Sequence, residues 1–96
     1  MSIALLATIP AQKGKRAELE KLFVKMRADV LKHEKGCSYY EIFTSRENPD
    51  AVVLVEVYDS QADWDAHNAS QHMKELVPVL TPLLGGKPDV KVVDHI

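Results

Sequence analysis

The sequence has few features of a secreted, membrane-spanning or nucleic-acid-binding protein. Its single cysteine, Cys37, has no partner within the chain, which fits a reducing, cytoplasmic compartment. No apolar run approaches the roughly 18 residues that span a bilayer, so no membrane helix is expected. The net charge of -2 argues against a basic nucleic-acid interface. The apolar N-terminus has no basic leader, and we interpret it as a strand rather than a targeting signal.

Motifs that would name a cofactor or a reaction are also missing. The chain contains neither G-x-x-x-x-G-K-[ST] nor G-x-G-x-x-G, and Gly85-Gly86 reads as a loop without a phosphate site. No Ser-His-Asp or Cys-His arrangement is evident, so motifs alone leave the reaction open. We interpret Cys37 as a small buried apolar residue, with a reactive thiol as the alternative.

What is present is the composition of one globular domain. The 96 residues are 46% hydrophobic and 27% charged, which excludes disorder and leaves no room for a second domain. We therefore treat residues 1–96 as a single domain. A chain this short buries a small share of its surface, so a partner chain is expected to help.

The order of hydrophobic patterns predicts strands and helices along the whole chain. Period-two or continuous apolar runs predict strands, and apolar residues three and four apart predict helices. The predicted strands are 3–9, 38–46, 51–58 and 90–96, and the predicted helices are 15–34, one from 60 and one from 71. Ser70 looks like a cap, so a break is expected near Ala69, and Pro78 and Pro82 should kink or end the last helix. The order βαββαβ indicates an α+β, ferredoxin-like domain with an antiparallel sheet.

The predicted strands are apolar on both faces. In residues 52–58, Val53, Val55 and Val57 oppose a second apolar set that includes Leu54. Helices cover only one face of such a sheet, and an antiparallel sheet facing water shows cleaner polar alternation. We therefore predict a homodimer whose sheets pack face to face.

Glu56 and two histidines are the candidate catalytic residues. An ionised Glu56 inside an apolar strand is costly unless it is paired, so it is either a base or substrate anchor, or a structural carboxylate. His67 and His72 would point about 140° apart on one unbroken helix, but the expected break lets both face one cleft. They lack a third ligand at a recognisable spacing, so no metal is expected. One of them is a candidate proton acceptor, and helix capping or solvent exposure is the alternative.

Aromatic side chains near these residues predict a pocket for a flat ring. Its candidate lining is Trp64, Tyr40, Tyr58 and Phe43, with Asn68 as a polar contact. The alternative is that most of these aromatics belong to the core.

Several of these segments resemble the antibiotic biosynthesis monooxygenase (ABM) domain family. They are the amphipathic helix ending in H-E-K-G-C, the hairpin into V-E-V-Y-D-S, and A-H-N-A-S-Q-H-M-K, with Glu56, Tyr58, Ser60, His67 and His72 the most specific positions. The resemblance covers essentially the whole chain. It implies a dimeric α/β barrel with a pocket between helices and sheet in each protomer.

The resemblance also implies a function. Some members oxidise quinols or polycyclic phenols with molecular oxygen and without a flavin or metal, so we expect a cofactor-independent monooxygenase acting on a small quinol-like aromatic. A pocket base would remove a phenolic proton, with Glu56 orienting His67 or His72. The alternatives are an isomerase of a small phosphorylated carbonyl compound, of the autoinducer-2-phosphate type, in which Lys74 or Lys87 would bind phosphate, and a non-catalytic small-molecule-binding or stress-response dimer.

Overall fold

The computed structural model describes all residues 1–96, which form four strands and three α-helices. A single-turn 3₁₀ helix, η1 (Thr81–Leu83), precedes the last strand. The elements are β1 (Ile3–Pro10), α1 (Arg16–His33), β2 (Cys37–Thr44), β3 (Ala51–Tyr58), α2 (Gln61–Asn68), α3 (Gln71–Leu80) and β4 (Asp89–Asp94). The predicted α+β, ferredoxin-like fold is confirmed, with its second helix divided into α2 and α3.

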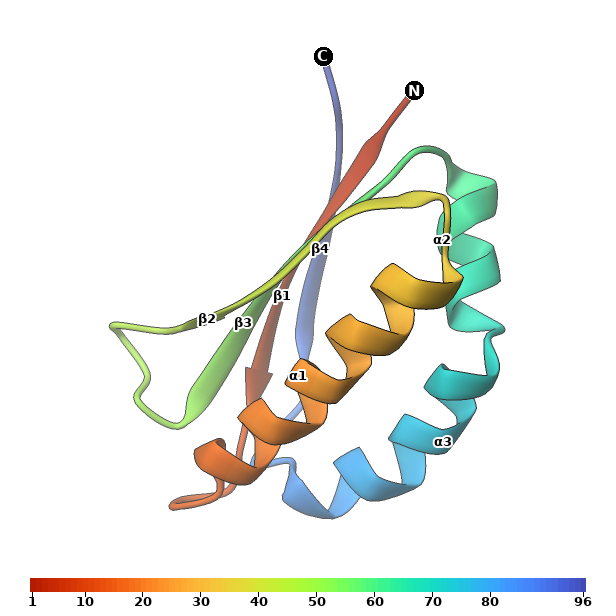
Figure 1. The fold of residues 1–96 in the computed structure, drawn as a ribbon. Helices are drawn as coiled ribbons and strands as arrows, with labels where there is room; N and C mark the ends of the chain where they lie inside the picture. The colour runs from red at the N-terminus through yellow and green to blue at the C-terminus, as the bar shows by residue number, and fades with distance from the viewer.

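The four strands form one antiparallel sheet in the order β2-β3-β1-β4. All the helices lie on one face of this sheet, as Figure 1 shows. Alternate residues of β1, such as Leu5 and Ile9, face the helices and are buried together with Phe23 and Val30 of α1. The core is therefore a single layer between sheet and helices.

Serine caps explain why the second helix is divided. The Ser60 hydroxyl accepts a hydrogen bond from the Asp63 amide at the start of α2, and the Ser70 hydroxyl accepts one from the Met73 amide at the start of α3. α2 ends at Asn68, so the predicted break near Ala69 is confirmed. This break separates two histidine-bearing helices.

One sequence prediction needs correction at the C-terminal end, that of the last strand. α3 continues through Pro78 to Leu80 at the cost of one backbone hydrogen bond, and it ends before Pro82. Pro82 lies in η1, after the α-helix has ended. The last strand ends at Asp94 rather than Ile96, because its pairing with β1 stops at the partner of Ile3.

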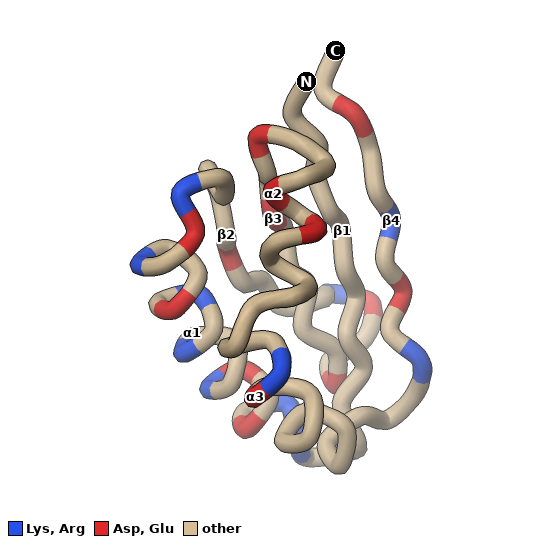
Figure 2. The backbone as a smooth tube through the Cα atoms, turned by 90° about the vertical axis from the view of Figure 1, so that its right-hand side faces the viewer, with Lys and Arg blue, Asp and Glu red and all other residues tan.

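The face of the sheet opposite the helices is open and largely apolar. Leu6 and Phe43 on this face are 42% and 47% exposed, and Val55, which pairs with Leu6, is half-buried. The prediction that Phe43 lines a pocket is therefore wrong, because its side chain lies on the face away from the helices. Lys and Arg, interspersed with acidic residues, follow α1, α2 carries only acidic charges, and β4 carries charges of both signs (Figure 2). None of the helices combines the length and the apolar character that crossing a bilayer requires.

Candidate functional site

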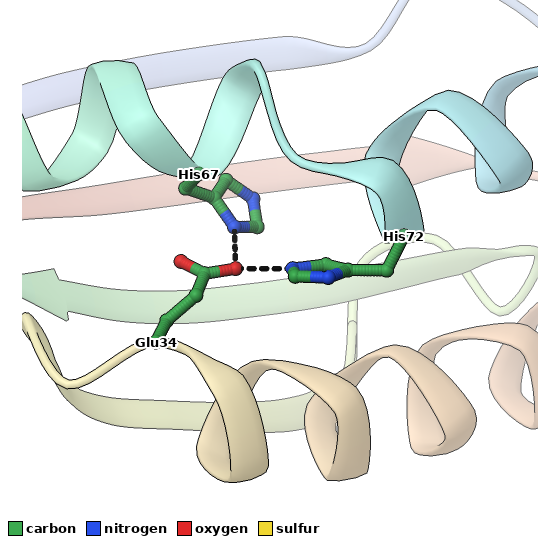
Figure 3. A group of neighbouring side chains, drawn as sticks. All are labelled: Glu34, His67 and His72. Atoms are coloured by element: carbon green, nitrogen blue, oxygen red, sulfur yellow. Dashed lines mark hydrogen bonds and ion pairs between the residues drawn. The ribbon is translucent and has the colours of Figure 1, made fainter.

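Three side chains from three segments meet beneath the break between α2 and α3. Glu34 follows the last residue of α1, His67 lies near the end of α2, and His72 lies in the first turn of α3 (Figure 3). The Nδ1 atom of His67 lies 2.8 Å from Oε2 of Glu34, and Nε2 of His72 contacts the same oxygen. A carboxylate only accepts hydrogen bonds, so both ring nitrogens donate to it. The helix break thus brings both histidines to one carboxylate.

Glu56 is buried on the other side of His67. Its Oε1 accepts a hydrogen bond of 2.6 Å from the Tyr58 hydroxyl and lies 3.8 Å from Nε2 of His67, beyond hydrogen-bond distance. Burial raises the pKa of the Glu56 carboxyl above its ordinary value, while the Tyr58 hydrogen bond and the neighbouring His67 lower it in part. Glu56 and Nε2 of His67 therefore face each other across a gap without a direct bond.

An apolar cavity of about 170 Å³ opens beside this pair. It lies between the sheet and α2–α3, and 11 of its 14 lining residues are hydrophobic. Its polar lining consists of Glu56, His67 and Asn68, and Trp64 and Tyr40 supply aromatic surface. A small apolar pocket with a few convergent polar groups is the usual form of a ligand site. We call this cavity the apolar pocket.

A second, polar cavity of about 730 Å³ lies on the opposite side of His67. Glu34 and His72 line it, together with three further carboxylates, those of Asp29, Asp63 and Glu75. We call it the outer cavity. His67 lines only the apolar pocket, yet its Nδ1 contacts Glu34 of the outer cavity. Its ring therefore connects the two cavities.

The structure places five of the seven predicted site residues around the apolar pocket. They are Glu56, His67, Trp64, Asn68 and Tyr40. Tyr58 is fully buried and does not line the pocket, because its hydroxyl is directed at Glu56 behind the pocket wall. His72 does not line it either, and faces the outer cavity.

Glu34 is the site residue that sequence reasoning did not identify. It lies 33 residues from His67 and 38 from His72, so no local spacing joins them. Glu34 meets the two histidines only because the end of α1 packs against the break between α2 and α3. The H-E-K-G turn at the end of the helix was visible in the sequence, but nothing there distinguished Glu34 from a solvent-exposed charge.

Together these contacts give His67 the environment of a general base. Glu34 fixes the ring and places the proton on Nδ1, which leaves Nε2 directed toward the apolar pocket. A carboxylate in this position stabilises the imidazolium that forms when Nε2 takes up a proton. The arrangement is suited to proton abstraction from a ligand in a water-poor cavity.

Comparisons with known proteins show the family and the fold. Residues 2–79 match the family model described as antibiotic biosynthesis monooxygenase. The structure is similar to that of a proposed antibiotic biosynthesis monooxygenase from Caulobacter crescentus, with 27% identity, a TM-score of 0.94 and coverage of 99% of this chain and 90% of that one.

Two further solved structures are similar over nearly the whole chain. A conserved protein from Methanosarcina mazei is 25% identical, with a TM-score of 0.89 and coverage of 97% of this chain and 91% of its own. A protein from Mycobacterium tuberculosis is 25% identical, with a TM-score of 0.90 and coverage of 100% and 96%. No curated protein matches the sequence.

Proposed function

Because this chain belongs to the antibiotic biosynthesis monooxygenase family, we propose that it is a cofactor-independent monooxygenase that oxidises a single-ring quinol or polyphenol with molecular oxygen. One observation carries the proposal beyond the family. A histidine oriented by a partly buried carboxylate lines an apolar pocket, and its second ring nitrogen faces Glu56 of that pocket. These are the groups needed to make a phenolate in a largely apolar site.

The reaction assigns a role to each group. Nε2 of His67 takes the phenolic proton, and Glu34 stabilises the resulting imidazolium through Nδ1. The electron-rich phenolate reduces oxygen directly: one oxygen atom forms a bond to ring carbon and the other leaves as water. The quinol is oxidised to a hydroxyquinone and supplies all the electrons, so the balance requires no other reductant. The protein contributes proton transfer, orientation and electrostatic support.

The volume of the pocket selects the size of the substrate. An apolar cavity of about 150 Å³ holds one benzene molecule. The apolar pocket, at about 170 Å³, accommodates one substituted ring and not a fused polycyclic system. Trp64 and Tyr40 offer aromatic surface to that ring, and the Asn68 amide offers a hydrogen bond to a second hydroxyl.

Glu56 lies close enough to His67 to contact the same substrate hydroxyl. The 3.8 Å gap between Nε2 of His67 and Oε1 of Glu56 is too short for a hydroxyl to lie in line between them, so we expect the hydroxyl to lie beside the pair. Tyr58 holds the carboxyl in place from behind. Glu56 and Tyr58 therefore act as positioning residues.

The lining of the pocket argues against the phosphorylated substrate of the isomerase alternative. A phosphate group in a buried site needs Lys or Arg to balance its charge. No Lys or Arg lines the apolar pocket, and neither Lys74 nor Lys87 lines the outer cavity. A non-catalytic binding protein remains the competing function, and turnover distinguishes it.

The open face of the sheet supports a homodimer as the working form. Leu6, Phe43, Val53, Val55 and Val57 lie on this face, away from the helices. Burying such a surface against a second copy stabilises the dimer by about 25 cal/mol for each Å² of apolar area removed from water. Packing of the two sheets face to face produces the α/β barrel.

Oxygen uptake tests the proposed function. The metal-stripped protein should consume oxygen with single-ring quinols above the rate of autoxidation, and the rate should saturate with substrate. Replacing His67 by glutamine should lower the rate about 10²–10⁴-fold. The matched control is His95→Gln, because His95 is exposed near the C-terminus and its ring contacts only the backbone oxygen of Ile96. No uptake with any quinol would favour the binding protein, and full activity of His67→Gln would remove His67 from the mechanism.

A further inference from the structure

We propose that Glu34, His67 and His72 form a binding site for one divalent transition-metal ion of the zinc and cobalt class, and that a metal in this site prevents His67 from acting as the base. The binding site follows from the geometry of the three residues, whereas its effect on turnover rests on the proposed function.

The three donor atoms are already gathered as a metal requires. Nδ1 of His67, Nε2 of His72 and a carboxylate oxygen of Glu34 lie within 4.8 Å of one another. Donors on a tetrahedron with bonds of about 2.1 Å are about 3.4 Å apart. The closest separation of Glu34 from His67 is 2.8 Å, so small side-chain rotations spread the donors to that distance. Two imidazoles and one carboxylate suit zinc, cobalt and iron(II).

Glu56 supplies the outer contact that a metal-binding histidine usually has. Such a histidine directs its second ring nitrogen at a carboxylate, which fixes the tautomer and strengthens the ligand. Nε2 of His67 faces Oε1 of Glu56 at 3.8 Å, and the Tyr58 hydroxyl in turn holds that oxygen. With a metal on Nδ1, the ring proton is on Nε2, where it faces the Glu56 carboxyl.

Glu34 itself is incompletely satisfied by protein groups. Its Oε2 contacts both histidines, but its buried Oε1 has no hydrogen-bond partner. A buried carboxylate oxygen without a partner is costly. A metal ion bound to Glu34 would offset part of this deficit.

The outer cavity provides both a route for a cation and room for its remaining ligands. Four carboxylates line the cavity, those of Asp29, Glu34, Asp63 and Glu75, against the single ammonium of Lys35. The excess of negative charge concentrates cations near the opening. A fourth coordination position would point into this cavity and hold water. The apolar pocket lies on the other side of His67 and would not contact the metal.

Occupancy has a defined consequence for the proposed chemistry. A metal on Nδ1 takes the place of the hydrogen bond to Glu34, and Nε2 then carries the remaining proton. A nitrogen that already carries a proton cannot accept one from a phenol. The metal-bound protein should therefore bind quinol but turn it over more slowly.

Cobalt titration of the untagged, substrate-free protein tests the site. Co²⁺ should bind with one-to-one stoichiometry, give the visible absorption of a four-coordinate ion and be displaced by Zn²⁺. His72→Ala and Glu34→Gln should each weaken binding by about 100-fold or more. His33→Gln is the matched control, because His33 stacks on the His72 ring at a centroid distance of 6.3 Å but is not a ligand. Circular dichroism confirms that each variant is folded.

The outcomes separate the metal site from the proposed function. Absence of cobalt binding at micromolar concentration, or equal binding by Glu34→Gln, overturns the site and leaves the oxygen-uptake result untouched. Binding that disappears in both ligand variants and persists in His33→Gln supports the site even where no quinol is oxidised. If stoichiometric Zn²⁺ leaves oxygen uptake unchanged in the active protein, the inhibitory role is wrong.

Discussion

Replacing Tyr58 by phenylalanine removes one buried hydroxyl and should destabilise the fold by a defined amount. Tyr58 is fully buried, and its hydroxyl donates a 2.6 Å hydrogen bond to Oε1 of Glu56, which is itself 5% exposed. That length is typical of a bond to an ionised carboxylate. Loss of a hydrogen bond to a charged group costs about 1.5–3 kcal/mol, because the remaining partner stays buried without it.

The measurement is urea or thermal unfolding at one fixed protein concentration, since dimerisation adds to the apparent stability. A loss of about 2 kcal/mol lowers the Tm of a domain of this size by about 8–16 °C. The matched control is Tyr39→Phe, because Tyr39 is 42% exposed in the single chain and its hydroxyl makes no hydrogen bond in the fold. Tyr39 pairs with Val57 on the open sheet face, so sedimentation must first show that the parent protein and both variants have the same oligomeric state. An exposed substitution of this kind should change stability by no more than about 0.5 kcal/mol.

The pH dependence of the Tyr58→Phe effect follows from Glu56. Burial raises the pKa of Glu56 in the folded state above 4.5, its ordinary value, so the folded protein binds more protons than the unfolded chain over the range between the two values. Stability therefore falls as pH rises through that range. The Tyr58 hydrogen bond lowers the pKa of Glu56. Removing this bond therefore raises that pKa further, and the loss of stability with rising pH becomes larger.

The loss caused by Tyr58→Phe should consequently be smaller near pH 4.5 than at neutral pH. The other charges that face Glu56, those of His67 and Glu34, are the same in both tyrosine variants, so the comparison with Tyr39→Phe isolates the hydroxyl. The reasoning is refuted if Tyr58→Phe is as stable as Tyr39→Phe at neutral pH, or if its deficit grows on acidification.

Three further predictions concern the site, the thiol and the sheet. Glu34→Gln should lower kcat about 10²-fold, because unit charges about 4 Å apart interact by about 4 kcal/mol at an effective dielectric of 20 and the amide retains only part of this. Glu75→Gln is the control, and equal rates in both variants would contradict the role of Glu34 beside His67. Burial raises the pKa of the Cys37 thiol to about 11, and the carboxylates of Glu34, Glu56 and Asp59 add to this effect. The native protein should therefore react slowly with a thiol reagent at pH about 8, and rapid labelling would contradict the burial of Cys37. Val55→Lys, on the open sheet face, should convert a sedimenting dimer to a monomer, and a monomeric parent protein at micromolar concentration would exclude the dimer.

Local chemistry made most of the fold predictable from the sequence. The alternating valines predicted β3, and the serines at 60 and 70 predicted the starts of two helices. The order of the elements predicted an antiparallel sheet. The sequence left open where the last helix ends, because a proline inside a helix removes only one hydrogen bond and α3, which packs against α1, continues through Pro78 to Leu80. Propensity alone does not include this tertiary term.

The candidate site was less accessible to sequence reasoning. His67 and Glu56 were identified because a charge in an apolar strand and a histidine near a helix break are visible locally. Glu34 was missed because only tertiary packing brings it to His67. For the same reason the sequence placed His72 and Tyr58 at the pocket, whereas the structure directs one to the outer cavity and the other to Glu56.

The fate of the oxygen atoms tests the central claim most directly. The metal-stripped protein is supplied with a single-ring quinol under oxygen gas labelled with the heavy isotope, and the mass of the product is measured by mass spectrometry. Monooxygenation predicts a hydroxyquinone that carries one heavy oxygen atom, formed at a rate that falls in His67→Gln but not in His95→Gln. A quinone without heavy oxygen, or product formation that does not depend on His67, would contradict it.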